Sequence, residues 1–113
     1  MSKKKASPFE NDTRKRIRED AEFAEAFFED LTERPLPVQL GILRRLAGIS
    51  QAELASRLKV TQAYLSKLEK EGSDHLVSIY ADLAKLLRGR LAIVPEGARI
   101  IPPKTHLKLP RAA

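Results

Sequence analysis

The sequence predicts a mainly α-helical bundle with an N-terminal helical extension and a short C-terminal β-strand. Apolar residues recur at steps of three and four positions, which is the spacing of one face of an α-helix. The first such stripe consists of Ile17, Ala21, Ala24, Phe28 and Leu31. Capping residues and glycines separate the apolar stripes into short segments, as expected for several packed helices. The 113 residues are enough for one ordinary domain.

The composition narrows the chemistry that the chain can perform. There is no cysteine, which excludes disulfides and cysteine-based zinc sites. His75 and His106 have no carboxylate pattern between them, so we expect no metal site and no cofactor. No nucleophile–base set or phosphate-binding loop is recognisable, and we therefore expect that the protein is not an enzyme.

Charge and hydropathy predict the cellular location of the protein and the kind of partner that it binds. No apolar run approaches the roughly 20 residues of a membrane span, so no membrane partner is expected. The basic N-terminus lacks the apolar segment of a signal peptide, which predicts a cytoplasmic protein. The formal net charge of +6 favours an anionic partner.

The N-terminal third divides into an arm and a helical extension. Residues 1–11 are polar and basic, and they predict a mobile arm. Residues 12–34 predict two short helices, and Asp20 caps the second of them. Pro35 and Pro37 end the extension, because neither continues a helix and each restricts the residue before it.

Residues 35–89 predict four more helices, each with its own boundary signal. Ser50 and Glu53 have the spacing of a capping box, and Thr61 is an N-cap residue for the helix after it. The predicted helices cover about residues 38–47, 50–58 and 61–71, followed by a fourth from Ser73 or Asp74 to Gly89.

Residues 90–113 predict a short strand and a proline-rich tail. Residues 91–94 have strand character and are stopped by Pro95. An edge strand has unpaired backbone groups, so this one could pair with its symmetry mate in a homodimer. Pairing with residues 99–101 of the same chain is the alternative. Three further prolines predict an extended tail.

The two short helices on either side of residues 59–61 have the features of a helix-turn-helix. Ala55 supplies the small residue needed where the helices cross, and Leu65 supplies the apolar anchor of the second helix. Lys59 occupies the position that takes a left-handed conformation. Either Lys59 adopts this conformation or the turn is reshaped.

The second helix of this pair exposes amide, hydroxyl and ammonium groups, which are the types that contact base edges and phosphates of double-stranded DNA. We predict that Gln62 and Lys67 read base edges. The residues predicted to contact phosphates are Thr61, Tyr64, Ser66 and Lys70. The alternative is an ordinary helical hairpin whose polar residues are only solvated.

Residues 42–89 resemble the lambda-repressor-like, XRE-type helix-turn-helix family of transcription regulators. The resemblance rests on the block GISQAELA at residues 48–55 and on LSKLE at residues 65–69, followed by Gly72. One departure is Lys59, because the family usually carries glycine there. A left-handed residue other than glycine costs roughly 1 kcal/mol.

This resemblance implies roles for particular residues. It implies that Gln51 binds a phosphate at a helix N-terminus, and that Arg44 and Glu69 form a structural ion pair. The residues that it places in the major groove are Thr61, Gln62, Ala63 and Lys67.

The net charge is divided into blocks of opposite sign, which suggests separate surfaces for separate partners. Seven acidic residues and no basic residue occupy positions 19–33, whereas residues 34–70 carry seven basic residues against two acidic ones. The chain is similar to HigA-like antitoxins of type II toxin–antitoxin systems in the order of its segments. An acidic–aromatic helix comes first, the XRE block follows, and residues 87–95 come last.

That second resemblance implies a prokaryotic or phage repressor, associated with the nucleoid, which binds an inverted-repeat operator as a homodimer. It also implies a basic toxin of the RelE/HigB type, which the acidic helix would neutralise. The candidate toxin-binding residues are Phe23, Glu25, Phe27 and Glu29. Two alternatives remain, namely a stand-alone XRE-type regulator and an acidic face that is only solvated.

Overall fold

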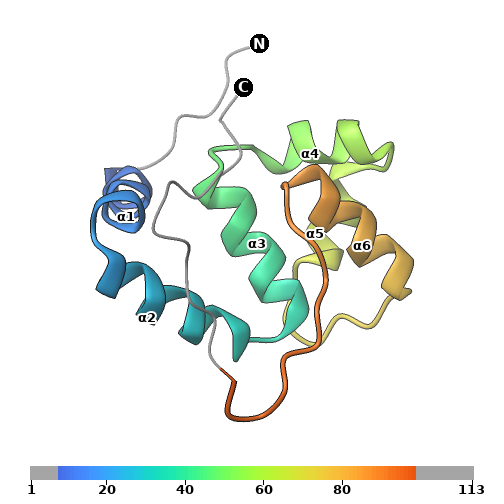
Figure 1. Cartoon of the computed structure of the whole chain (residues 1–113). Helices are drawn as coiled ribbons and strands as arrows, with labels where there is room; N and C mark the ends of the chain where they lie inside the picture. Colours follow the sequence, from blue (N-terminus) through green and yellow to red (C-terminus); the bar gives the residue numbers. More distant parts are fainter. Residues whose placement is uncertain (1–7, 99–113) are drawn as a thin grey trace.

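The chain folds into six α-helices within residues 8–98, the part that the computed structural model describes (Figure 1). The mainly helical class is therefore confirmed. No helix in this part is long and apolar enough to cross a membrane. The helices are α1 (Pro8–Glu19), α2 (Ala21–Thr32), α3 (Leu36–Leu46), α4 (Gln51–Leu58), α5 (Gln62–Leu68) and α6 (Val77–Leu86).

Helix α3 is the central element and joins two groups of helices. In Figure 1 it lies between α1 and α2 on one side and α4 to α6 on the other. It packs against α1 and against α6, while α4 packs against both α5 and α6. The N-terminal extension and the helix-turn-helix region thus share α3 as their common support.

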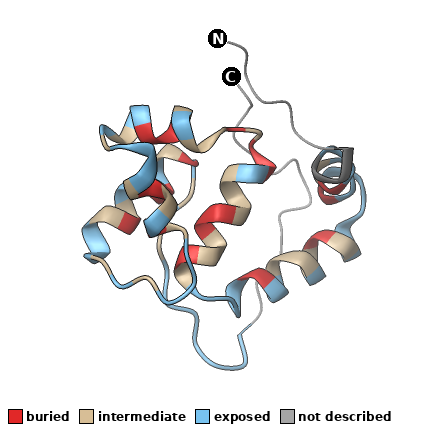
Figure 2. Ribbon diagram, turned by 180° about the vertical axis from the view of Figure 1, so that it is seen from behind, coloured by how far each residue is buried: buried red, intermediate tan, exposed pale blue. Residues whose placement is uncertain are grey.

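The larger hydrophobic core lies within α3 to α6 and is built mainly from aliphatic side chains. Figure 2 shows buried positions along the sides of these helices that face one another. Tyr80 is the aromatic residue that is buried within this cluster. The largest fully buried side chains are Ile49, Leu54, Leu65, Leu68, Leu83 and Leu87.

A smaller apolar cluster attaches the extension to α3. Ile17 of α1, Ala24 of α2 and Leu46 of α3 are buried together, and the three phenylalanines of α2 pack against them. Asp20 accepts a hydrogen bond from the Phe23 backbone N–H at 3.1 Å, so the predicted N-cap of α2 is confirmed.

Helices α1 and α3 begin earlier than the sequence predicted, and both have a proline in the first turn. Helix α1 begins at Pro8 instead of residue 12, because proline is tolerated in the first turn of a helix. The predicted arm of residues 1–11 therefore overlaps α1, and its first seven residues lie outside the described part. For the same reason α3 begins at Leu36, and Pro37 is buried in its first turn.

Helices α5 and α6 are shorter than predicted. Helix α5 ends at Leu68, and Gly72 lies in the following turn with φ +86°. Helix α6 begins at Val77, where Leu76 is the N-cap and provides no side-chain bond. The predicted caps do not serve it, since the Ser73 hydroxyl is within hydrogen-bond distance of His75 instead.

The C-terminal β-strand predicted at residues 91–94 is wrong. Residues 90–95 have no regular secondary structure, and residues 8–98 contain no strand with which they could pair. Leu91 packs against the larger core, whereas Ile93 is 98% exposed. An isolated strand is unstable without a partner strand, so a sequence with strand character does not form a strand by itself. The alternative partner, residues 99–101, lies outside the described part.

The turn between α4 and α5 contains a left-handed residue that is not glycine. Lys59 has φ 66° and ψ 42°. The Val60 N–H donates to the Ala55 carbonyl at 3.0 Å, which closes the C-terminus of α4. Of the two possibilities left by the sequence, Lys59 thus adopts the left-handed conformation.

We expect the substitution Lys59→Gly to raise the free energy of unfolding by about 1 kcal/mol, because glycine has no Cβ that opposes a positive φ. Urea denaturation followed by circular dichroism measures this change. Ser56→Gly is the matched control, because Ser56 is exposed inside α4 and glycine there destabilises the helix. Equal or lower stability of Lys59→Gly would contradict the argument.

Candidate nucleic-acid interface

Local capping bonds define where α4 and α5 begin. The Ser50 hydroxyl accepts from the Glu53 N–H at 3.0 Å, and the Thr61 hydroxyl accepts from the Tyr64 N–H at 3.1 Å. Both N-caps predicted from the sequence are confirmed. Each bond satisfies one of the backbone donors that a helix leaves unpaired at its N-terminus.

The two helices of the candidate interface are held together by a few fully buried residues. Ala55 is buried at the crossing of α4 and α5, and Leu65 has an exposed fraction of 0%. Leu54 and Leu68 complete the contact. Because Leu65 and Leu68 face the core, the opposite side of α5 faces solvent.

The residues predicted to contact DNA lie on α5 and at its two ends. Those that are exposed are Thr61, Gln62, Ala63, Lys67 and Lys70. Tyr64 and Ser66 are half-buried at the edge of this surface. Helical spacing places Ser66 one turn after Gln62 and Lys67 one turn after Ala63, since residues four apart are neighbours on one side of a helix. Lys70 follows the last turn of α5.

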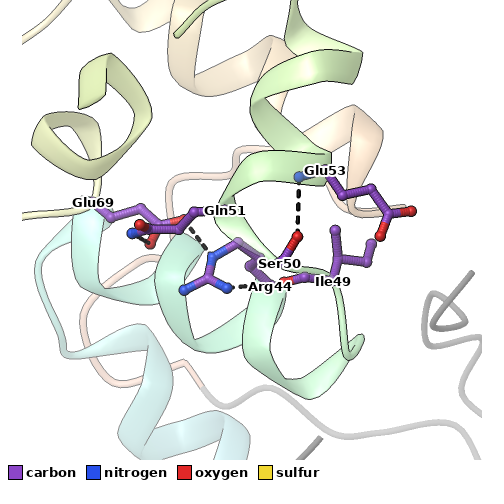
Figure 3. Close-up of polar contacts among 6 residues, drawn as sticks. All are labelled: Arg44, Ile49, Ser50, Gln51, Glu53 and Glu69. Atoms are coloured by element: carbon purple, nitrogen blue, oxygen red, sulfur yellow. Dashed lines mark hydrogen bonds and ion pairs between the residues drawn. The ribbon is translucent and has the colours of Figure 1, made fainter. Parts of the chain in front are cut away.

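Behind this surface, the Glu69 carboxylate joins three parts of the chain (Figure 3). Arg44 of α3 donates from Nε to Glu69 Oε2 at 2.7 Å, and Gln51 donates from Nε2 to Glu69 Oε1 at 3.0 Å. Arg44 also donates from Nη1 to the Ile49 carbonyl at 2.8 Å. The ion pair is shielded from water, because the exposed side-chain fractions are 11% for Arg44 and 8% for Glu69.

The bond between Gln51 and Glu69 is a contact that the sequence did not predict. The side chain of Gln51 is half-buried at the start of α4 and already uses Nε2 within the protein. An amide nitrogen carries two hydrogens, so the second one stays available to a phosphate oxygen. The phosphate contact predicted for Gln51 is therefore compatible with its bond to Glu69.

The candidate toxin-binding residues differ in how far they are buried. Phe23 and Phe27 are half-buried and pack on the small cluster of the extension. The guanidinium of Arg16 lies over the Phe23 ring, 4.0 Å from its centroid. Glu29 is exposed, whereas Glu25 is half-buried. The aromatic residues thus serve first to attach α2, and Glu29 is the acidic residue of the two that lies at the surface.

A pocket of about 200 Å³ lies between the extension and α3. Its apolar lining comes from α2 and α3. Thr13 of α1, Arg45 of α3 and the ion pair between Asp30 and Arg34 complete it. Periodicity could not locate this pocket, because it depends on how three helices meet. The apolar lining residues are Phe27, Leu31, Ile42 and Leu46.

A comparison with protein families finds a match in the central part of the chain. Residues 40–92 match a protein-family model described as helix-turn-helix. Neither the curated proteins nor the solved structures include a significant match to the chain. The matched range contains α4, the turn, α5 and α6, but not the extension. A helix-turn-helix match indicates a DNA-binding domain of the type found in transcription regulators.

We expect Glu69→Ala to lower the free energy of unfolding by roughly 3 kcal/mol, because it leaves the shielded Arg44 charge without its partner. Urea denaturation measures the loss. The substitution Glu53→Ala is the control, since it breaks the more exposed pair between Glu53 and Arg57. That loss should stay below about 1 kcal/mol.

The double variant Arg44→Met/Glu69→Leu separates the charge from the packing. Its stability should recover much of the loss seen for Glu69→Ala, because no unpaired charge stays buried. Equal losses for Glu69→Ala and Glu53→Ala would show that the shielded pair is no more important than an exposed one.

Proposed function

We propose that the protein is a sequence-specific DNA-binding repressor that places α5 in the major groove. The observation that carries the proposal is the helix-turn-helix match over residues 40–92, in which α5 has a polar and basic exposed side. The protein binds its operator as a homodimer. Two-fold symmetry then requires an inverted repeat with half-sites about one helical turn apart.

The exposed residues of α5 divide the recognition of DNA between them. Gln62 and Lys67 contact base edges, and Lys67 suits the acceptor atoms of guanine. Ala63 lies at the groove surface and makes close approach possible. The contacts to phosphates come from Gln51, Thr61, Tyr64, Ser66 and Lys70. The net charge of +5 in residues 34–70 favours association with the DNA backbone.

We expect Gln62→Ala and Lys67→Ala each to weaken binding to the operator by about 1–3 kcal/mol and to relax the preference at one base position. Footprinting and titration on the DNA upstream of the protein's own gene measure both effects. Lys15→Ala is the control, because Lys15 is an exposed cation of α1 outside the matched range. Unchanged footprints for both α5 variants would exclude α5 as the recognition helix.

We further propose that the extension makes the protein an antitoxin of a type II toxin–antitoxin operon. A toxin of the RelE/HigB type is basic, and α2 offers it an acidic face. The charge supports this assignment, because an acidic face is unsuited to the DNA that the basic surface would bind. The exposed acidic residues of α2 and its C-cap are Glu22, Glu29, Asp30 and Glu33.

We expect the double variant Glu25→Gln/Glu29→Gln to weaken binding of the neighbouring gene product while operator affinity stays within about twofold, since the extension lies outside the helix-turn-helix match. Titration calorimetry at two salt concentrations measures the first effect, and the operator titration measures the second. The double variant Glu71→Gln/Asp82→Asn carries the same charge change at exposed positions outside α2 and serves as the control.

The result also separates the two forms of the proposal. A basic partner whose affinity falls only with the α2 variant supports the antitoxin role. Equal affinity for wild type and variant would show that the acidic face of α2 is only solvated, and absence of any binding by the wild type would leave a stand-alone regulator.

A further inference from the structure

A small polar and aromatic cluster fills the connection between α5 and α6. The Tyr80 hydroxyl of α6 donates to Ser73 Oγ at 3.1 Å, and Ser73 Oγ lies 2.7 Å from His75 Nδ1. Tyr80 is buried, while Ser73 and His75 are half-buried. These two bonds fix the imidazole ring on an otherwise irregular loop.

The fixed imidazole ring is packed against the start of α5. Tyr64 meets His75 edge-to-face, with ring centroids 5.6 Å apart and planes at 89°. On its other side His75 meets Tyr80 at 6.3 Å and 89°. Such edge-to-face contacts restrict the rotation of both rings. His75 therefore links a residue of the recognition helix to a buried residue of α6.

The hydroxyl group of Tyr64 differs from that of Tyr80. The Tyr80 hydroxyl is bonded to Ser73, whereas the Tyr64 hydroxyl has no hydrogen-bond partner among residues 8–98. Tyr64 lies at the edge of the exposed α5 surface, beside Thr61, which caps its backbone N–H. The ring is thus held in place, while its polar end stays available to another molecule.

We propose that His75 is a positioning residue for DNA binding, which holds the ring of Tyr64 so that its hydroxyl meets a phosphodiester oxygen of the DNA backbone. This inference rests on the proposed DNA-binding function and adds a residue outside the helix-turn-helix itself. Holding the ring before binding lowers the entropy that is lost when the phosphate contact forms. His75 touches no DNA in this arrangement and acts through Tyr64.

A double-mutant cycle on operator affinity tests the coupling. We expect Tyr64→Phe and His75→Ala each to weaken operator binding about three- to tenfold, and the double variant to be no weaker than the weaker single variant. Fluorescence polarisation with a labelled fragment of the upstream DNA measures the four dissociation constants. Effects that multiply, or an unchanged affinity for His75→Ala, would overturn the proposal.

Tyrosine fluorescence provides a readout that general loss of stability does not imitate. The chain has two tyrosines and no tryptophan, and Tyr80 is 4% exposed, so acrylamide quenching reports mainly on the half-buried Tyr64. In the otherwise unchanged protein His75→Ala should increase quenching of Tyr64 by acrylamide. The substitution His75→Phe keeps an aromatic edge against Tyr64 and should restore both the quenching and most of the affinity. Failure of His75→Phe to restore either would overturn the proposal.

Two controls distinguish a failure of the proposed role of His75 from unfolding of a variant and from a failure of the proposed function. Circular dichroism at the temperature of the titration verifies that each variant is folded, and Asp82→Ala, an exposed change on α6, serves as the neutral control. If the wild-type protein does not bind the upstream DNA, the proposed function fails and this inference fails with it. If the wild type binds and the cycle is additive, only the role of His75 is wrong.

Discussion

The carboxylate of Glu69 is the group on which the arrangement of the helix-turn-helix depends. It accepts from Arg44 of α3 and from Gln51 at the start of α4, and it belongs itself to the end of α5. One shielded anion thereby fixes three helices relative to one another, because its two oxygens must satisfy donors from two directions. Apolar packing alone would allow these helices to slide, whereas directional bonds to a single carboxylate select one arrangement.

The same central helix also carries the extension, and this connects the two charged surfaces of the protein. Arg44 faces the network around Glu69, while Leu46 faces the small cluster that holds α1 and α2. The acidic face of α2 is therefore attached rigidly to the helix that supports the basic region. Any molecule that binds the extension would therefore lie at a defined position relative to α5.

Local sequence signals predicted the helix-turn-helix well. Features that depend on tertiary contacts could not be predicted in this way. The caps at Ser50 and Thr61 and the left-handed Lys59 depend on neighbouring residues alone, and the sequence contains those neighbours. The strand at residues 91–94 failed because a strand needs a partner that local pattern does not specify. The hydrogen bond from Gln51 to Glu69 joins residues 18 positions apart, and the sequence around neither residue contains a signal that predicts it.

At Lys59, the strain of the left-handed conformation and the benefit of the side-chain charge oppose each other. Its ammonium group sits at the carboxyl end of α4, where the helix dipole favours a positive charge, and at the margin of the candidate interface. Glycine would relax the backbone but would remove this cation from the terminus of α4. The turn therefore combines an unfavourable backbone conformation with a favourable charge at the end of α4, and a substitution that relieves the first also loses the second.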